Sequence, residues 1–185
     1  PVGKKAFTRF SEVKLDSLLQ VTKAINSNNS VEQLFDIFTD ILQNKLKISK
    51  FVLFINEQQG WRCAIRKGIG EEYKSIDVEI DLLPIKEILA TSFASNTPIN
   101  FQEHAIEKKL LDIVIPVYHK SFPLAYLLIG DSDDSTEIIS PSLKHLNFVQ
   151  TLSSIILVAI ENKKLAKENI RQAAVKKELE LASHM

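Results

Sequence analysis

The sequence contains little of what stabilises disulfide-linked or metal-bound domains. Its 185 residues include a single cysteine, Cys63. One thiol excludes a disulfide within the chain and a zinc site built from several cysteines. Low cysteine usage is typical of reducing compartments, and we therefore expect a cytoplasmic protein.

Glycine and proline are also scarce, with five and six residues respectively. Sandwiches and barrels need many special turns, so this scarcity favours long helices with a small sheet. No apolar run reaches the roughly 18 residues that a membrane span requires. Basic and acidic residues both number 23, and a net charge of zero argues against a nucleic-acid-binding protein. Because Pro1 is not an initiator residue, we expect a piece of a longer protein.

Two helices are predicted near the N-terminus. The first spans about 11–27, where apolar and small residues recur at helical spacing: Leu15, Leu18, Leu19, Thr22 and Ile25. Ser30 opens the second helix, and Gln33 three residues later completes a capping-box pattern. Both helices are amphipathic and should cover a sheet.

Strands are predicted where β-branched and aromatic residues cluster. The segments 50–56 and 61–67 form one hairpin, and 110–119 and 124–130 form another, with residues 121–123 between them. Residues 76–80 alternate apolar and acidic side chains, which fits a short strand or an extended loop. A helix is predicted over about 84–93, and 97–100 is a loop leading into a short edge strand.

A long helix is predicted at the C-terminal end. Ser140 and Pro141 suit its first positions, and neither glycine nor proline follows before Met185. A helix of that length spans roughly 65 Å, so its second half must reach solvent, a partner or a following domain. The predicted fold is α+β: an antiparallel sheet of about five or six strands flanked by helices, with a long C-terminal helix.

Three segments in this order resemble the GAF domain, a small-molecule-sensing module of signalling proteins. They are a glycine turn at 66–72, a strand pair at 113–117 and 124–130, and a closing helix that ends with Ala159-Ile160-Glu161-Asn162-Lys163-Lys164-Leu165. The resemblance implies a GAF-like sensory domain over 1–165 and a linker helix over 166–185. It also implies a GAF-type sheet beneath a ligand pocket.

A second resemblance lies in the tail. Residues 177–182, Lys-Glu-Leu-Glu-Leu-Ala, are similar to the linker that precedes the catalytic domain of sporulation-type (PPM-fold) serine phosphatases. The two resemblances together imply a bacterial regulatory domain attached to a phosphatase that acts in sigma-factor regulation. Its catalytic residues would lie outside this chain.

Candidate ligand-binding residues are those near the predicted lid at 68–104. They are Arg62, Tyr73, Phe93 and Phe101, and the alternative is that the three aromatic rings simply fill the core. For a homodimer and linker helix, the candidate residues are Ile156, Ile160, Leu165, Ile170, Ala174 and Leu181. We expect neither a nucleic-acid nor a membrane partner.

No catalytic, metal or cofactor site is predicted. The four histidines lack metal-ligand spacing, and the acidic loop 131–140 lacks the glycine and glutamate of a calcium loop. Cys63 is interpreted as a half-buried strand residue, since a reductase would need a second cysteine. The predicted function is therefore a non-catalytic sensor, with a GAF-type reductase or a pure dimerisation module as alternatives.

Overall fold

A computed structural model describes residues 2–70, 78, 99–100, 111, 113–130 and 141–184. The helical elements are α1 (Val2–Asn26), α2 (Val31–Asp40), a π-helical turn η1 (Ile41–Lys45), α5 (Pro141–Lys144) and α6 (Leu146–Ser183). The strands are β1 (Lys50–Glu57), β2 (Gly60–Lys67), β3 (Ile99–Asn100), β4 (Ile113–His119) and β5 (Phe122–Gly130). The predicted α+β architecture with a long C-terminal helix is confirmed.

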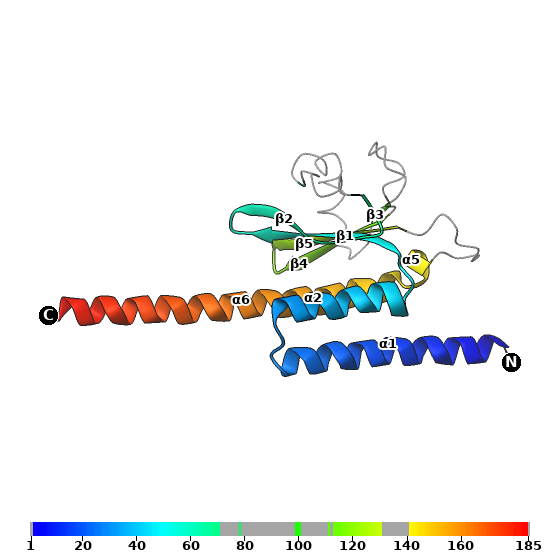
Figure 1. Cartoon of the computed structure of the whole chain (residues 1–185), viewed down its shortest axis with the longest axis horizontal. Coiled ribbons are helices and arrows are strands. Elements are labelled where there is room, and N and C mark those ends of the chain that lie inside the picture. Colours follow the sequence, from blue (N-terminus) through cyan, green and yellow to red (C-terminus); the bar gives the residue numbers. More distant parts are fainter. Residues whose placement is uncertain are drawn as a thin grey trace.

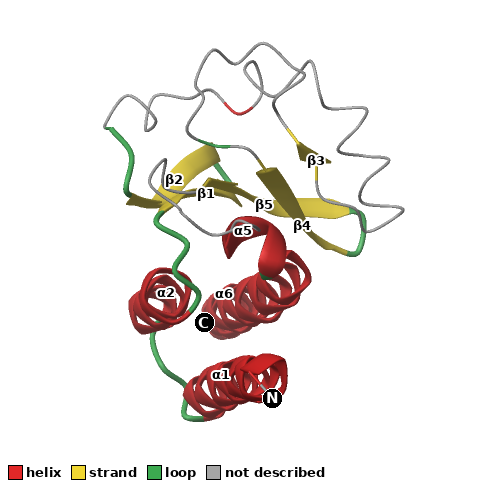
Figure 2. Ribbon diagram, turned by 90° about the vertical axis from the view of Figure 1, so that its right-hand side faces the viewer, coloured by secondary structure: helices red, strands yellow, loops and turns green. Residues whose placement is uncertain are grey.

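The described strands form one antiparallel sheet in the order β2-β1-β5-β4-β3. Three helices lie in layers on one face of this sheet: α2 and α6 lie next to it, and α1 lies beneath them (Figures 1 and 2). α6 contacts β4 and β5, and α1 contacts both α2 and α6. The helices therefore cover one side of the sheet.

The main core lies between the sheet and these helices. Strand β1 supplies Phe51, Leu53 and Ile55 to it, while α2 supplies Phe38 and α6 supplies Ile156. The intervening residues of β1 are buried on the opposite face, because successive side chains of a strand point to opposite sides. Burial on both faces explains the continuous apolar run that predicted this strand.

Helix α1 forms as predicted, but not all of its predicted apolar stripe is buried. Ser17, Val21 and Ala24 are the buried residues, whereas Leu15 and Leu19 are 57% and 58% exposed. The hydroxyl of Ser17 donates to the carbonyl of Val13 at 2.7 Å, which satisfies it without a partner from another element. Ser17, Val21 and Ala24 thus pack α1 against its neighbours, together with the partly buried side chains of Leu18 and Ile25, which were predicted. The side chains of Leu15 and Leu19 point away from the core.

The start of α2 is as predicted. The Ser30 hydroxyl accepts a hydrogen bond from the backbone N–H of Gln33, and the Gln33 side chain accepts one from the backbone N–H of Ser30. This reciprocal capping box fixes where the helix begins.

Three local predictions are corrected. The long C-terminal helix is interrupted at His145, between α5 and α6, where the backbone is not helical (φ −107°, ψ 7°). The buried ring of His145 packs on Phe10, with ring centroids 4.9 Å apart. The β4–β5 turn lies at Lys120 and Ser121, and β5 already begins at Phe122. Val78 is helical and buried, not part of a strand. The predicted helix over 84–93 lies outside the described residues.

Candidate functional site

The sheet face opposite the helices carries a second apolar surface, the second-face cluster. Its buried members are Val52, Phe54, Ile69, Val78, Leu111, Val114, Tyr126 and Leu128. Trp61 and Cys63 of β2 are partly buried and pack against it. This surface comes from three central strands and from segments next to them, so it is the natural place for an apolar binding site.

Two aromatic rings dominate one end of the second-face cluster. Trp61 stacks on Tyr126 with ring centroids 4.8 Å apart and planes inclined by 22°. Tyr126 is 8% exposed. Burial raises the pKa of its phenol, and neighbouring Tyr118 raises it further. The phenol therefore stays protonated at neutral pH, and the two stacked rings give this end of the cluster an aromatic character with one hydroxyl beside it.

Cys63 occupies the position predicted for it, half-buried in the middle of β2. Its thiol lies 3.6 Å from the carbonyl of Ile65. The sequence contains no second cysteine that could resolve an oxidised thiol.

Of the four predicted ligand-binding residues, Tyr73, Phe93 and Phe101 lie outside the described residues. Arg62 is described, and its placement differs from the prediction. It pairs across the hairpin with Ile55, which faces the helices, so the Arg62 side chain lies on the helix side of the sheet. The second-face cluster begins one residue earlier, at Trp61. Sequence alone cannot choose between the two faces, because that choice depends on the register of the β1–β2 pair.

Arg62 belongs instead to a group of charged residues between the β1–β2 hairpin and α6. Its guanidinium donates to a carboxylate oxygen of Glu57 at 2.9 Å, and the ammonium of Lys164 lies 3.7 Å from the same oxygen. The hydrogen bond from Arg62 is the main cause that lowers the pKa of Glu57, and the charge of Lys164 adds to it. The same bond raises the pKa of Arg62. Glu57 is therefore charged at neutral pH and lies between two cations.

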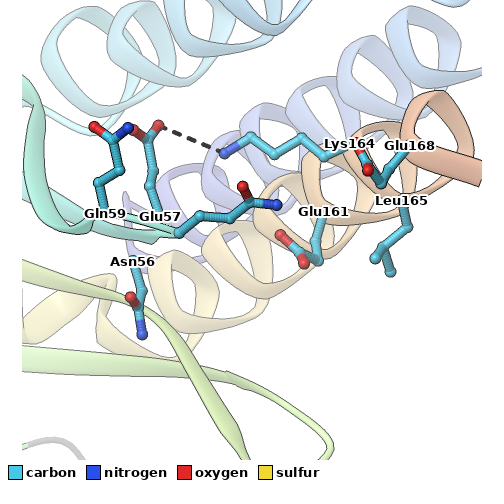
Figure 3. A pocket seen from close by; sticks show the side chains of 8 residues that line it. Asn56, Glu57, Gln59, Glu161, Lys164, Leu165 and Glu168 are labelled. Carbon is cyan, nitrogen blue, oxygen red and sulfur yellow. Dashed lines mark ion pairs between the residues drawn. The ribbon is translucent and has the colours of Figure 1, made fainter. Parts of the chain in front are cut away.

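Glu57 and Lys164 of this group also line an open hollow of about 540 Å³ (Figure 3). It lies between the β1–β2 hairpin and α6, and seven of its eight lining residues are polar or charged: Asn56, Glu57, Gln58, Gln59, Glu161, Lys164, Leu165 and Glu168. The chemistry of this lining suits ion pairing better than the binding of an apolar ligand.

α6 is also attached to the turn between α1 and α2. The ammonium of Lys163 donates to the side-chain carbonyl of Asn28, and it lies 3.4 Å from the backbone carbonyl of the same residue. Asn28 has a left-handed backbone with φ +56°, which is common for asparagine at the end of a helix. The pKa of Glu32, at the start of α2, is lowered mainly by a hydrogen bond from its own backbone and next by a hydrogen bond from the Ser30 side chain. The positive charge of Lys167 on α6 lowers it further. Three basic residues of α6, Lys163, Lys164 and Lys167, thus interact with other parts of the domain.

The predicted dimer residues fall into two groups. Ile156 and Ile160 are 1% and 3% exposed within the main core, so they attach α6 to its own domain. Leu165, Ile170 and Leu181 are 48%, 72% and 61% exposed, and Ala174 is exposed too. Beyond Ile160 no described residue of α6 is buried, although the helix continues without a break across the predicted boundary at 165/166.

Further apolar side chains are exposed on the same helices. Val175 on α6, which the sequence did not single out, is 50% exposed, and Leu179 is 66% exposed; Leu15 and Leu19 on α1 are exposed as well. A signal for the α1 pair was present, because Leu15 and Leu19 lie on the face opposite Ser17 and Val21 at helical spacing.

Within the part of the chain that the structure describes, no three histidine, cysteine or acidic side chains come together as metal ligands. His104 and the acidic loop 131–140 lie outside that part. None of the described helices is long and apolar enough to cross a bilayer.

No family model and no curated protein matches the chain. Several solved structures do. The GAF domain of a phosphoenolpyruvate-protein phosphotransferase from Coxiella burnetii is 16% identical, with a TM-score of 0.58 over 84% of this chain and 96% of that one. The corresponding Acinetobacter domain is 14% identical, with a TM-score of 0.56 over 82% and 94%. The GAF domain of a two-component sensor histidine kinase from Bacillus halodurans is 18% identical, with a TM-score of 0.50 over 75% and 98%. The chain therefore has the GAF fold.

Proposed function

We propose that this chain is a regulatory, sensory domain without catalysis of its own, which binds a small molecule and controls an attached output domain. The observation that carries the proposal is the second-face cluster, an apolar surface with stacked Trp61 and Tyr126 on the side of the sheet away from the helices. Small-molecule sites are lined mainly by apolar and aromatic side chains with a few polar groups, as this cluster is. The likeness to GAF domains of sensor and phosphotransferase proteins supports the same function.

The binding site would be completed by residues of the segment 68–104, with Tyr73, Phe93 and Phe101 as its candidate aromatic side chains. Arg62 is left out of this proposal because it lies on the helix side. A pure dimerisation module remains the competing function, and ligand binding separates the two.

Trp61 is the only tryptophan in the chain, so its fluorescence reports on the proposed site alone. We expect at least one compound in a panel of common metabolites to raise the melting temperature by about 5–10 °C at 100 times its Kd. The same compound should change Trp61 emission with a matching Kd. Phe101→Ala should reduce the ligand-induced shift more than it lowers the melting temperature of the ligand-free chain. A panel without any such compound would favour the dimerisation module.

We also propose a homodimer formed through the terminal helices. The exposed side chains Leu165, Ile170 and Leu181 on α6, and Leu15 and Leu19 on α1, leave apolar surface that a second copy can cover. The part of α6 beyond the domain, drawn at the C-terminal end in Figure 1, is a helix without tertiary support. Most helical stability in proteins comes from packing of an amphipathic face, so pairing with a second helix would stabilise this part of α6.

Light scattering at micromolar concentration should give twice the 20.9 kDa mass of one chain. Truncation after Leu165 removes most of the exposed apolar residues of α6 and should shift the mass to that of one chain. The double variant Leu15→Gln/Leu19→Gln, with α6 left intact, tests the contribution of α1 to the dimer. A single-chain mass for the intact protein, with α6 still helical by circular dichroism, would contradict the proposal.

For the output domain we propose a serine phosphatase of sigma-factor regulation, acting in the bacterial cytoplasm. The support is the resemblance of residues 177–182 to the linker helix of such enzymes. The GAF-type reductase is not favoured, since Cys63 is the only thiol in the sequence. Purified chain that reduced methionine sulfoxide, with the activity lost in Cys63→Ser, would overturn the non-catalytic assignment.

A further inference from the structure

The β1–β2 hairpin connects the two sides of the sheet through two consecutive residues of β2. Trp61 packs into the second-face cluster and stacks on Tyr126. The next residue, Arg62, points to the helix side, where it binds Glu57 at 2.9 Å. A movement of this strand therefore changes both contacts at once, because neighbouring side chains of a strand share one backbone.

Glu57 carries the connection from the hairpin to α6. It is the last residue of β1 and pairs with Gly60 at the end of the hairpin. Its carboxylate contacts Arg62 within the hairpin. It also lies 3.7 Å from the ammonium of Lys164 on α6 (Figure 3). One carboxylate thus joins two elements that are distant in the sequence.

Lys164 lies where α6 leaves the domain. It follows Ile160, the last buried residue of the helix, by one turn. The adjacent Lys163 is bound by Asn28 in the α1–α2 turn. The helix is therefore held at its exit by polar contacts from two sides, and past them it is exposed.

We propose that the hairpin transmits the state of the second-face cluster to the exit of α6 through the contacts Trp61–Tyr126, Arg62–Glu57 and Glu57–Lys164. A change at Trp61 shifts the end of the hairpin, weakens or strengthens the hold of Glu57 on Lys164, and so changes the order and direction of the exposed helix. Exposed ion pairs are individually weak, and a weak contact is easily shifted between made and broken states. This inference rests on the proposed sensory function and names the route by which its signal would leave the domain.

A double-mutant cycle on the full chain tests the route without any ligand. Trp61→Ala removes the stack, and Glu57→Gln removes the charge that both cations share. We expect each change to increase hydrogen exchange at amides 161–168 by about two- to fivefold, the range that corresponds to an exposed ion pair. The double variant should exchange no faster than the faster single variant, because both changes break the same route.

Two further variants keep the cycle decisive. Arg171→Gln removes an ion pair with Glu168 at 3.8 Å that lies within α6, so its effect should simply add to that of Trp61→Ala. If Trp61→Ala does not fold, Tyr126→Leu removes the partner ring and should give the same pattern. Unchanged exchange at 161–168, or additive effects of Trp61→Ala and Glu57→Gln, would overturn the route.

The two proposals can fail separately. If Trp61→Ala and Glu57→Gln have non-additive effects on exchange but no metabolite alters Trp61 fluorescence, the route is supported and ligand sensing is not. If a metabolite binds but the two mutations have additive effects, ligand sensing is supported and the route is not.

Discussion

Replacing Gly68 with alanine is expected to lower the free energy of unfolding by about 2–5 kcal/mol, from backbone strain together with a steric clash. Gly68 follows β2 with φ +67°, a left-handed conformation that side chains disfavour. A Cβ atom there would lie 2.0 Å from the backbone carbonyl oxygen of Ser49, just before β1. That neighbour is main chain and cannot rotate away. Urea unfolding followed by circular dichroism measures the loss.

Gly60 offers a matched control in the same hairpin. Its φ of +114° is also unfavourable for alanine, but a Cβ atom would have no neighbour within 4 Å. Gly60→Ala should therefore lose only the backbone part, about 1–3 kcal/mol. If the two substitutions destabilise the chain equally, close packing against Ser49 contributes nothing and the prediction is wrong.

The second large effect is expected from Ile156→Ala, which should destabilise the domain by about 2–5 kcal/mol. Ile156 is 1% exposed and lies in the main core, where α6 packs against the sheet. Shortening it removes buried apolar contacts and leaves a cavity. Thermal and urea unfolding at low protein concentration measure the domain itself, separately from any association.

Ile170→Ala is the matched change on the exposed part of the same helix. Ile170 is 72% exposed, so its loss should change the stability of a single chain by no more than about 0.5 kcal/mol. If the proposed dimer forms through α6, the effect of Ile170→Ala should appear in the concentration dependence of that association instead. A large loss of stability at low concentration would mean that the exposed helix packs on its own domain.

Much of the fold was determined by local sequence. The apolar runs of β1 and β5 and the reciprocal Ser30–Gln33 cap act over a few residues, and they predicted the corresponding elements. The absence of glycine and proline after Pro141 likewise predicted a helix too long for one small domain to cover. These features depend on steric preference and burial, which short stretches of sequence contain.

Only the tertiary structure decided which face of its strand or helix each side chain buries and which distant residues it contacts. Whether Arg62 joins the second-face cluster or the helices depends on pairing with Ile55, which a pattern of residue types does not specify. The burial of Ser17 in place of Leu15 depends on how closely α1 approaches its neighbours. The contacts of Lys163 with Asn28 and of Lys164 with Glu57 join residues more than a hundred positions apart. Such contacts exist only once the sheet has brought the hairpin and α6 together, because no local interaction favours them beforehand.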